Sequence, residues 1–527
     1  MEEKKSKEEL ENLHWAEIIA KKIVETKKPP FIITAGMTTS GPAHLGTVCE
    51  FFYPYTIKQA LAEMGYDAKV IFIADILDAF DSIPFEVKNY EEQLAKQLGQ
   101  PLSNVIDPFG CHASFGEHYL SEVEEAIKNL QVEVEIKKVN ELYKSGAFDK
   151  FAKIFLENEE KTKEIVATTS GKDISSLNDW SPIMPICENC GKIATTRVIW
   201  HDNENYEYIC DRDVGYTKGC GYHGFGKISQ HNYKLQWRIH WPSWQSYFHS
   251  SAEGGGVDHF TRGGSWDTAV EIHKQILKDE PPVGYKYGFF LFKGKKFSKS
   301  KGIGITAKQL LQLVPPEIVK YILVEPDLQE NKDFDPAGEK LLYIYDELER
   351  ISKLTQPSNR AEKKKLMAFK LVIKKLNWKA KFSEILLRYQ IYKDWKKVGE
   401  MLNDKEGVTY LAPYIEEWIK QGYAPERYSF SINPTKIKNE EHKKIVNEFL
   451  NRLDENMSDI DIHNLVYKIS KEKQISANEV FSILYNAIIG KSSGPRFGRL
   501  VVAIGISNVK EILRKSLDNS FKINSHK

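Results

Sequence analysis

The sequence predicts an α/β protein with a parallel sheet of the nucleotide-binding kind, a cysteine-rich insertion in that sheet, and a helical region after it. Three observations lead to this prediction. An apolar run at 31–34 passes through a small-residue turn into a helical pattern. Four of the six cysteines gather between positions 187 and 220. From about residue 342 onward, apolar residues recur at helical spacing and strand patterns are sparse.

Length and charge limit the possible classes. At roughly 150 residues per domain, 527 residues predict three or four domains. Because 74 basic side chains face 73 acidic ones, a nucleic-acid surface must come from local clusters such as 363–365 or the tail from Lys510. For any one of these clusters, a solvated helix face rich in Lys and Glu is the favoured interpretation.

The amino-terminal stretch, the lengths of the apolar runs and the cysteine spacing indicate the compartment of the protein. The charged amino-terminal stretch lacks the apolar core of a signal peptide, and no apolar run approaches the roughly 20 residues of a membrane span. We therefore expect a cytoplasmic protein without a membrane partner. Cysteines at metal-like spacing in such a protein favour zinc over disulfides.

The first predicted strands and helix have the order of a βαβ unit. We expect a helix from about Lys7 to Thr26, ended by a proline pair, and a strand that begins at Phe31. A glycine turn at 36–41 leads into a helix from about Ala43 to Met64. The run 68–74 then predicts the second parallel strand.

His44 and Gly46 fall at the first turn of the predicted helix. Backbone N–H groups at a helix start carry partial positive charge, glycine admits a phosphate close to the backbone, and an imidazole can donate to a phosphate oxygen. The stretch therefore predicts a nucleotide cradle, although alone it fits an ordinary strand-turn-helix equally well.

A second stretch, 292–302, contains five lysines, two serines and two glycines. It follows a strand expected at 287–291, and the ends of strands in open parallel sheets are where ligands bind. Mobile ammonium groups at that place can neutralise a polyphosphate as its charge changes.

The insertion at 181–226 has the spacing of a zinc ribbon. A CxxC pair is followed by two further cysteines in a segment rich in Gly, Asn and Tyr. The expected ligands are Cys187, Cys190, Cys210 and Cys220, with His201 and His223 as reserve ligands.

A second candidate metal site lies at 107–118, where carboxylate, thiolate and imidazole groups fall within twelve residues. Its four potential ligands are Asp107, Cys111, His112 and His118. The alternative is a buried cysteine beside histidines on a helix surface.

The remaining motifs are turns and caps. Asp258 in the glycine turn 253–259 suits a ribose hydroxyl, although such an Asp is often only a turn former. Ser265 is expected to cap a helix that runs to Lys278, and 306–309 reads as a capping box.

The two loops together resemble the paired signatures of class I aminoacyl-tRNA synthetases, since 43–47 is similar to the HIGH element and 296–300 to KMSKS. With the stretches at 107–118, 181–226 and 494–498, nearly the whole chain resembles the archaeal-type class I lysyl-tRNA synthetases. The chain departs from the usual signatures at Leu45, Thr47, Val257 and Phe297.

The resemblance implies a class I synthetase Rossmann catalytic domain with a zinc-ribbon insertion, followed by an all-α anticodon-binding region. The implied boundaries are 1–180 and 227–305 for the two halves of the catalytic domain, 181–226 for the ribbon, 306–355 for a stem-contact connecting region and 356–527 for the helical domain.

The implied activity is that of a lysine–tRNA ligase with lysine, ATP and tRNA(Lys) as partners and Mg²⁺ and Zn²⁺ as metals. Catalysis is assigned to His44, Lys296 and Lys299. ATP binding is assigned to Ser40, Pro42, His44, Gly46, Thr47, Gly256, Asp258, Lys296, Ser298, Lys299 and Ser300.

The lysine pocket is implied to contain Gly36, Thr38, Trp237, His259 and Tyr287. Aromatic walls suit an aliphatic stem that ends in a cation. The resemblance also makes Asp107, Cys111, His112 and His118 zinc ligands. Two alternatives remain, a class I synthetase for another amino acid such as glutamate and a non-catalytic tRNA-binding relative.

Overall fold

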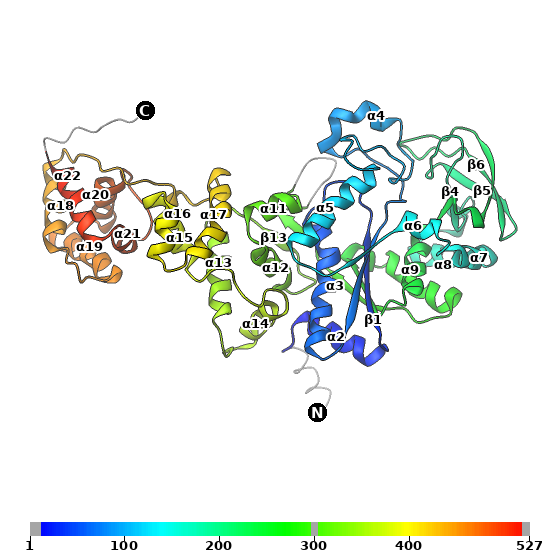
Figure 1. The fold of residues 1–527 in the computed structure, drawn as a ribbon, viewed down its shortest axis with the longest axis horizontal. Coiled ribbons are helices and arrows are strands. Elements are labelled where there is room, and N and C mark those ends of the chain that lie inside the picture. Colours follow the sequence, from blue (N-terminus) through cyan, green and yellow to red (C-terminus); the bar gives the residue numbers. More distant parts are fainter. Residues whose placement is uncertain (1–11, 297–303, 519–527) are drawn as a thin grey trace. The chain divides into compact units, whose positions relative to one another are not determined.

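The computed structural model describes residues 12–296 and 304–518 (Figure 1). These residues separate into two compact units. The first comprises the described residues within 1–311, 319–334 and 354–374, and the second comprises those within 312–318, 335–353 and 375–527. Within the described ranges no helix is long and apolar enough to cross a membrane.

The first unit is built on a five-stranded sheet with the order β10-β9-β1-β2-β3. All neighbouring strands in it are parallel. The strands are β1 (Phe31–Met37), β2 (Ala68–Ala74), β3 (Glu135–Lys138), β9 (Ala252–Gly256) and β10 (Val283–Tyr287). The predicted parallel sheet is therefore confirmed, and the predicted range of β2 agrees with the structure.

Helices cover this sheet because parallel strands are joined by crossovers. The long helix α3 (Leu45–Glu63) connects β1 to β2 and packs against both. Its predicted end is close to the observed one, since Gly65 follows with a φ of +85°. The other helices of this unit are α2 (Trp15–Thr26), α4 (Glu91–Ala95), α5 (Phe115–Asn129), α6 (Val139–Lys144), α7 (Asp149–Glu157), α8 (Glu159–Ser170), α9 (Trp237–Tyr247), α10 (Ser265–Ile272) and α14 (Arg360–Val372).

The insertion forms its own small sheet. The strands β5 (Thr196–His201), β6 (Asn205–Cys210) and β7 (His223–Lys227) pair antiparallel. The chain enters and leaves this segment side by side, because β4 (Ile183–Pro185) pairs with β8 (Tyr233–Leu235). This closure makes the segment an excursion from the parallel sheet.

Two predicted elements around the site differ from the structure. The strand expected at 287–291 is wrong, because β10 ends at Tyr287 and a separate β11 (Phe290–Phe292) pairs with β12 (Lys295–Lys296) and β13 (Lys332–Phe334). Gly288 marks the break, since its N–H donates to Leu328 O at 3.1 Å and a Cβ there would lie 2.4 Å from Glu330 O.

Ser265 is the first helical residue of α10, and Gly264 precedes it as the N-cap. The Ser265 hydroxyl accepts a hydrogen bond from Trp237 Nε1 at 3.1 Å, so it does not cap the helix as predicted. The predicted capping box at 306–309 is confirmed. Gln309 N donates to Thr306 Oγ1 at 3.1 Å, and Thr306 N donates to Gln309 Oε1 at 3.0 Å.

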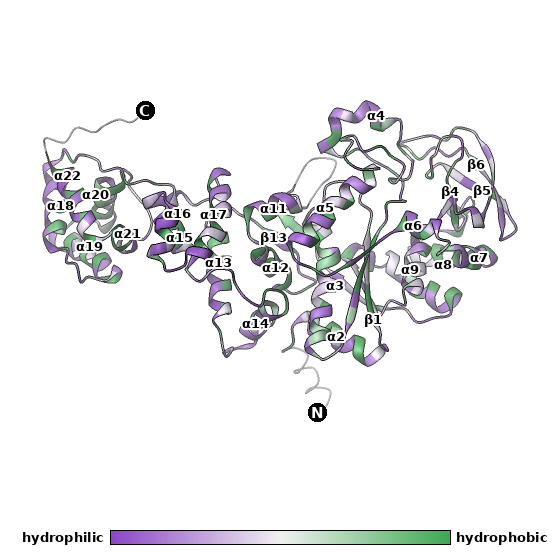
Figure 2. Ribbon diagram, viewed as in Figure 1, coloured by the Kyte–Doolittle hydropathy of each residue, from purple (hydrophilic) through white to green (hydrophobic). Residues whose placement is uncertain are grey.

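The helices after the capping box carry purple and green residues side by side in Figure 2, the pattern of amphipathic helices. Hydrogen bonds between buried indole and carboxyl groups connect segments of the second unit. For example, Glu349 accepts a hydrogen bond from Trp378 Nε1 at 3.0 Å. α11 (Ala307–Leu313) and α12 (Pro316–Val324) are divided between the two units. The helices of the second unit are α13 (Glu339–Ser352), α15 (Phe382–Tyr392), α16 (Trp395–Met401), α17 (Lys405–Lys420), α18 (Glu440–Arg452), α19 (Asp459–Lys473), α20 (Ala477–Ile489), α21 (Phe497–Ile504) and α22 (Ile506–Leu517).

A buried ion pair links the closing strand β8 to the parallel sheet. Lys234 Nζ, with a side chain only 1% exposed, donates to Asp75 Oδ2 at 2.7 Å and also to Asp78. Asp75 follows β2 directly, so this lysine joins two segments that are distant in sequence.

Lys234→Met should destabilise the first unit by about 3–5 kcal/mol, because it leaves the buried carboxylate of Asp75 and the half-buried one of Asp78 without their cation. The measurement is urea unfolding followed by tryptophan fluorescence. Lys227→Met at the exposed end of β7 is the control. Equal unfolding midpoints for the two variants would contradict this role of the ion pair.

Candidate active site

The strand order reverses direction at β1. From β1 the chain moves outward to β2 and β3, whereas the later strands β9 and β10 lie on the opposite side of β1. In open parallel sheets this reversal leaves a crevice beyond the carboxyl ends of the strands, where ligands bind. A cavity of about 270 Å³ lies there, with Met37, Gly256 and Tyr287 in its wall from the ends of β1, β9 and β10.

His44 stands at the amino terminus of α3, immediately before the first helical residue. It is the N-cap, with φ −123° and ψ 178°, and its Nδ1 accepts the Gly46 N–H at 2.9 Å. Since Nδ1 is an acceptor, the proton of the neutral ring is on Nε2. Burial lowers the pKa of His44 from 6.5 to about 4, so the ring is neutral at physiological pH.

The neighbours of His44 explain the sequence around it. A Cβ on Gly46 would lie 2.6 Å from His44 Cε1, so glycine is required for the imidazole to fold over the helix terminus. Thr47 Oγ1 accepts the His44 N–H at 3.2 Å and completes a capping box. The observed helix therefore begins two residues later than Ala43, and His44 precedes its first turn.

The loop between β1 and α3 is fixed to α5. Thr39 Oγ1 donates to Gly116 O at 3.0 Å, and Ala43 N donates to Glu122 Oε2 at 2.8 Å. Ser40 and buried Pro42 lie between these anchors, outside the lining of the 270 Å³ cavity. These two hydrogen bonds fix the loop that leads to the amino terminus of α3, where His44 and Gly46 line the cavity.

Eight of the predicted site residues line this one cavity, although they come from four separate stretches of sequence. They are His44, Gly46, Thr47, Gly256, Asp258, His259, Tyr287 and Lys296. Lys296 Nζ lies 3.6 Å from the centre of the Phe289 ring. Ser298, Lys299 and Ser300 lie outside the described residues.

An aromatic cluster stands beside the cavity. Trp237 stacks on Trp241 with ring centres 5.5 Å apart and planes at 13°, and His259 lies 5.5 Å from Trp241. Glu253 on β9 organises this cluster, because it accepts Trp241 Nε1 at 2.8 Å and Trp244 Nε1 at 2.9 Å. Burial raises the pKa of Glu253 to about 7.

Gly36 and Thr38 are each fixed by close contacts with neighbouring residues. A Cβ on Gly36 would lie 2.9 Å from Ile73 O and 3.2 Å from Trp244, so β1 packs closely at this point. Thr38 Oγ1 donates to Asp78 Oδ2 at 2.5 Å, and Asp78 is in turn paired with Lys234. The ion pair from the closing strand thus reaches the end of β1.

The four ribbon cysteines are all free and their sulfur atoms converge. Cys187 Sγ lies 3.7 Å from Cys220 Sγ, and Cys190 Sγ lies 3.7 Å from Cys210 Sγ. Tetrahedral zinc with Zn–S bonds of about 2.3 Å requires sulfur separations of about 3.8 Å. The donor set and spacing therefore fit a structural zinc ion.

The second group has a similar geometry before and at the start of α5. Cys111 Sγ lies 3.2 Å from Asp107 Oδ2, 3.1 Å from His112 Nδ1 and 3.3 Å from His118 Nδ1. A mixed tetrahedral zinc site requires separations of about 3.3–3.6 Å, which these values approach. Because Cys111 is exposed, the alternative of a buried cysteine is wrong.

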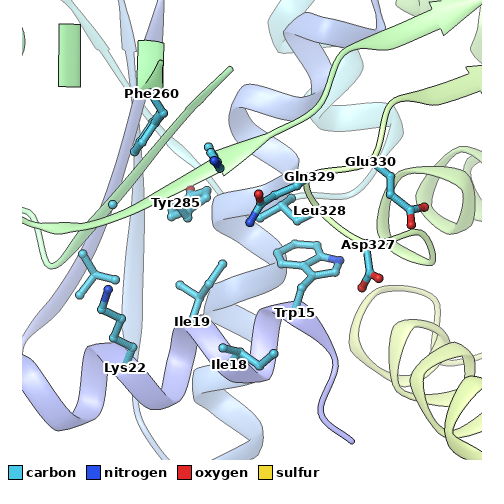
Figure 3. Close-up of a pocket in the computed structure, with 13 residues that line it drawn as sticks. Trp15, Ile18, Ile19, Lys22, Phe260, Tyr285, Asp327, Leu328, Gln329 and Glu330 are labelled. Atoms are coloured by element: carbon cyan, nitrogen blue, oxygen red, sulfur yellow. The ribbon is translucent and has the colours of Figure 1, made fainter. Parts of the chain in front are cut away.

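A larger hollow of about 780 Å³ lies between α2, β10 and the segment 327–330 (Figure 3). In the close-up, Trp15, Ile18 and Ile19 project from α2 toward it, with Tyr285 on the opposite wall. None of the predicted site residues lines this hollow. Its walls contain the acids Asp327 and Glu330 but no histidine, whereas the smaller cavity has both His44 and His259.

The family model described as tRNA synthetases class I (K) matches residues 13–376. The chain belongs to this family. It is 32% identical over 524 residues to the lysine–tRNA ligase of Archaeoglobus fulgidus, covering 96% of this chain and all of that one. It is 29% identical over 521 residues to the lysine–tRNA ligase of Thermoplasma acidophilum, covering 95% and 98% of the two chains.

A solved structure of a glutamate tRNA ligase from Elizabethkingia meningosepticum, in complex with its amino acid, covers 93% of this chain and 99% of that one. Its TM-score of 0.43 and identity of 11% are too low to carry an argument. The match to the class I (K) family is therefore the informative one, and its range contains every predicted site residue.

Several groups around this class I cavity were missed by sequence reasoning. Asp78 fixes Thr38, Glu122 fixes the loop before His44, Lys234 pairs with Asp78, and Glu253 holds the two indoles beside Trp237. Two of them carried a faint signal, since Asp78 follows the carboxyl end of a predicted strand and Glu253 opens the glycine turn 253–259.

The purified protein should contain about two zinc ions per chain, as measured by elemental analysis. Cys111→Ser should remove one equivalent, and Cys220→Ser should remove the other and unfold the insertion, because structural zinc contributes to folding. Cys49→Ser, at a buried cysteine outside both groups, is the control. A single equivalent in the unmodified protein that is retained in Cys111→Ser would eliminate the second site.

Proposed function

We propose that this chain is a lysine–tRNA ligase that activates lysine with ATP and transfers the lysyl group to the 3′ end of tRNA(Lys). Both relatives described above bear that name, and the alignment with this chain covers at least 98% of the length of each relative. The observation that carries the proposal is the cavity at the strand reversal, where His44, Asp258, Tyr287 and Lys296 meet.

In the first step an oxygen of the lysine carboxylate attacks the α-phosphorus of ATP, and pyrophosphate leaves with the electron pair of the broken bond. The protein orients these groups and stabilises phosphate charge without forming a covalent bond itself. His44 is suited to this role because its Nε2–H donates while its Nδ1 is fixed by Gly46.

Other residues of the site take the remaining parts of ATP. Gly46 and Thr47 place the first turn of α3 against the phosphates, Gly256 lets the nucleotide approach β9, and Asp258 accepts from the ribose hydroxyls. We assign Lys296 and Lys299, with Ser298 and Ser300, to the leaving pyrophosphate. Ser40 and Pro42 shape the loop that ends at His44.

Lysine itself lies between β1 and the aromatic cluster in this proposal. Gly36 and Thr38 approach its backbone, while Trp237, His259 and Tyr287 contact the methylenes. Mg²⁺ carried by the ATP phosphates would offset their charge, and zinc on the two ligand groups would stabilise the local folds that present them.

In the second step a ribose hydroxyl of the terminal adenosine of tRNA attacks the lysyl carbonyl, and AMP leaves. We assign catalysis to 1–180 and 227–305, the ribbon to 181–226, contact with the tRNA stem to 306–355, and anticodon binding to the helices of 356–527. We assign this reaction with tRNA to the cytoplasm.

Amino-acid-dependent exchange of pyrophosphate into ATP tests the function. With tRNA supplied, lysine should support exchange and each of the other amino acids should not. Exchange with glutamate alone would make the chain a synthetase for that amino acid. No exchange with any amino acid would leave a tRNA-binding relative without catalysis.

His44→Ala and Lys299→Ala should each lower the exchange rate by about 100- to 1,000-fold, because each removes a group that acts on phosphate charge in the transition state. The KM for lysine should stay near its original value. The control is His249→Asn, which changes an exposed histidine to a residue that tolerates its φ of +52°. Unchanged turnover in both alanine variants would refute these roles.

A further inference from the structure

Lys296 is carried by a hairpin that a distant strand holds in place. β11 pairs antiparallel with β12, where Leu291 lies opposite Lys296, and it pairs in parallel with β13 on its other side. In the turn of the hairpin, Gly294 N donates to Asp333 Oδ1 at 2.8 Å. β13 thereby fixes the hairpin that brings Lys296 to the cavity.

Phe289 precedes this hairpin, and both polar groups of its backbone are bonded. Its N–H donates to Asn331 Oδ1 at 2.9 Å, and its carbonyl oxygen accepts the Lys332 N–H at 2.9 Å. Gly288 before it donates its N–H to Leu328 O at 3.1 Å. These three hydrogen bonds hold Phe289 in the wall of the cavity.

A buried lysine fixes the segment that supplies these partners. Lys332, only 5% exposed, donates from Nζ to the carbonyl oxygens of Asp327, Leu328 and Glu330 at 3.2–3.3 Å. One cation on three carbonyl oxygens closes the turn 327–330, so the turn that receives the Gly288 N–H is itself held in place.

The Lys296 ammonium group lies over the face of the Phe289 ring, with Nζ 3.6 Å from the ring centre. The two side chains are diagonal neighbours across the hairpin, because Phe289 is two residues before Leu291, the residue opposite Lys296. The negative face of an aromatic ring attracts a cation at this distance. This contact therefore orients the ammonium group at the edge of the cavity.

An aromatic ring holds an ammonium group in a different way from a carboxylate. Glu50 and Asp258 also line the cavity, yet neither forms an ion pair with Lys296 within the residues that the structure describes. A carboxylate would compensate the charge, and a phosphate would then have to displace that carboxylate. The ring covers only one side of the ammonium group, so N–H donors on the other side stay available to a phosphate oxygen.

We propose that Phe289 is a positioning residue for adenylation, which holds the ammonium group of Lys296 toward the phosphates of ATP. The inference rests on the proposed function, in which Lys296 acts on the leaving pyrophosphate. Phe289 forms no bond in the reaction and works only through Lys296. A lysine that is already oriented loses less conformational freedom when the transition state forms, so the benefit is in the rate of this step.

Phe289→Leu removes the ring face and keeps an apolar side chain. In the full-length protein with tRNA present, we expect kcat for lysine-dependent exchange to fall about 3- to 30-fold, the range that a cation–π contact contributes. The KM for lysine should stay near its original value. Phe289→Tyr keeps an aromatic face and should retain most of the rate.

A double-mutant cycle with Lys296→Met distinguishes positioning from a structural role. If Phe289 acts through Lys296, Phe289→Leu should have no further effect on kcat once Lys296 is replaced. If the ring only supports the local fold, its loss should lower kcat by the same factor in both backgrounds, and that result would overturn the proposal.

Pentafluorophenylalanine at position 289 separates the shape of the ring from its charge distribution. It has nearly the size of phenylalanine but lacks the negative face, so this protein should match Phe289→Leu in kcat. A rate equal to that of the unmodified protein would overturn the proposal, even where Phe289→Leu fails to fold.

The matched control is Phe85→Leu, the same change at an exposed phenylalanine that also has a lysine over its ring. Lys88 Nζ lies 5.3 Å from the centre of the Phe85 ring, and neither residue lines the cavity. This variant should keep kcat and both KM values unchanged.

The two proposals fail in different ways. If the unmodified protein shows no lysine-dependent exchange, the proposed function fails and the Phe289 inference fails with it. If the unmodified protein is active but Phe289→Leu keeps its kcat, or lowers kcat equally after Lys296→Met, only the Phe289 inference is overturned.

Discussion

The hydrogen bond from Gly46 N to His44 Nδ1 connects the fold of this protein to its chemistry. It caps α3, it sets the tautomer of the imidazole, and it requires glycine at position 46. The bond is useful only because α3 begins at the carboxyl edge of β1, where the strand order reverses. A helix terminus elsewhere on the sheet would carry the same dipole without a crevice for a nucleotide.

Local signals predicted much of the framework. The run 68–74 became β2 without change, Gly65 ended α3 as expected, and Thr306 with Gln309 formed the predicted capping box. Each of these features depends on a few neighbouring residues. The strand expected at 287–291 failed because Gly288 pairs with Leu328, a contact across forty residues that no local window contains.

The residues of the candidate site also fall into two groups, those that a short stretch of sequence predicts and those that it does not. His44, the lysine loop and the cysteine groups lie in short stretches whose spacing indicates their chemistry, and the structure brings the described members of these stretches together as clusters. Glu50 and Glu253 look like ordinary acids in sequence, one on a helix and one before a glycine turn. What distinguishes them is burial and the identity of their neighbours, which arise only when distant strands pair.

Two acids beside the cavity are neutralised by different means, and this difference determines what each contributes to the fold. Asp78 is paired with Lys234 and Glu253 accepts two indole N–H groups, so both are satisfied within the fold. Lys234 also pairs with Asp75 at the end of β2, so this ion pair joins the closing strand to the parallel sheet. Loss of Lys234 would leave the buried carboxylate of Asp75 without a cation, which is costly. Glu253 has no cation among its hydrogen-bond partners within the described residues, and burial raises its pKa to about 7, so it can take up a proton where Asp75 depends on Lys234.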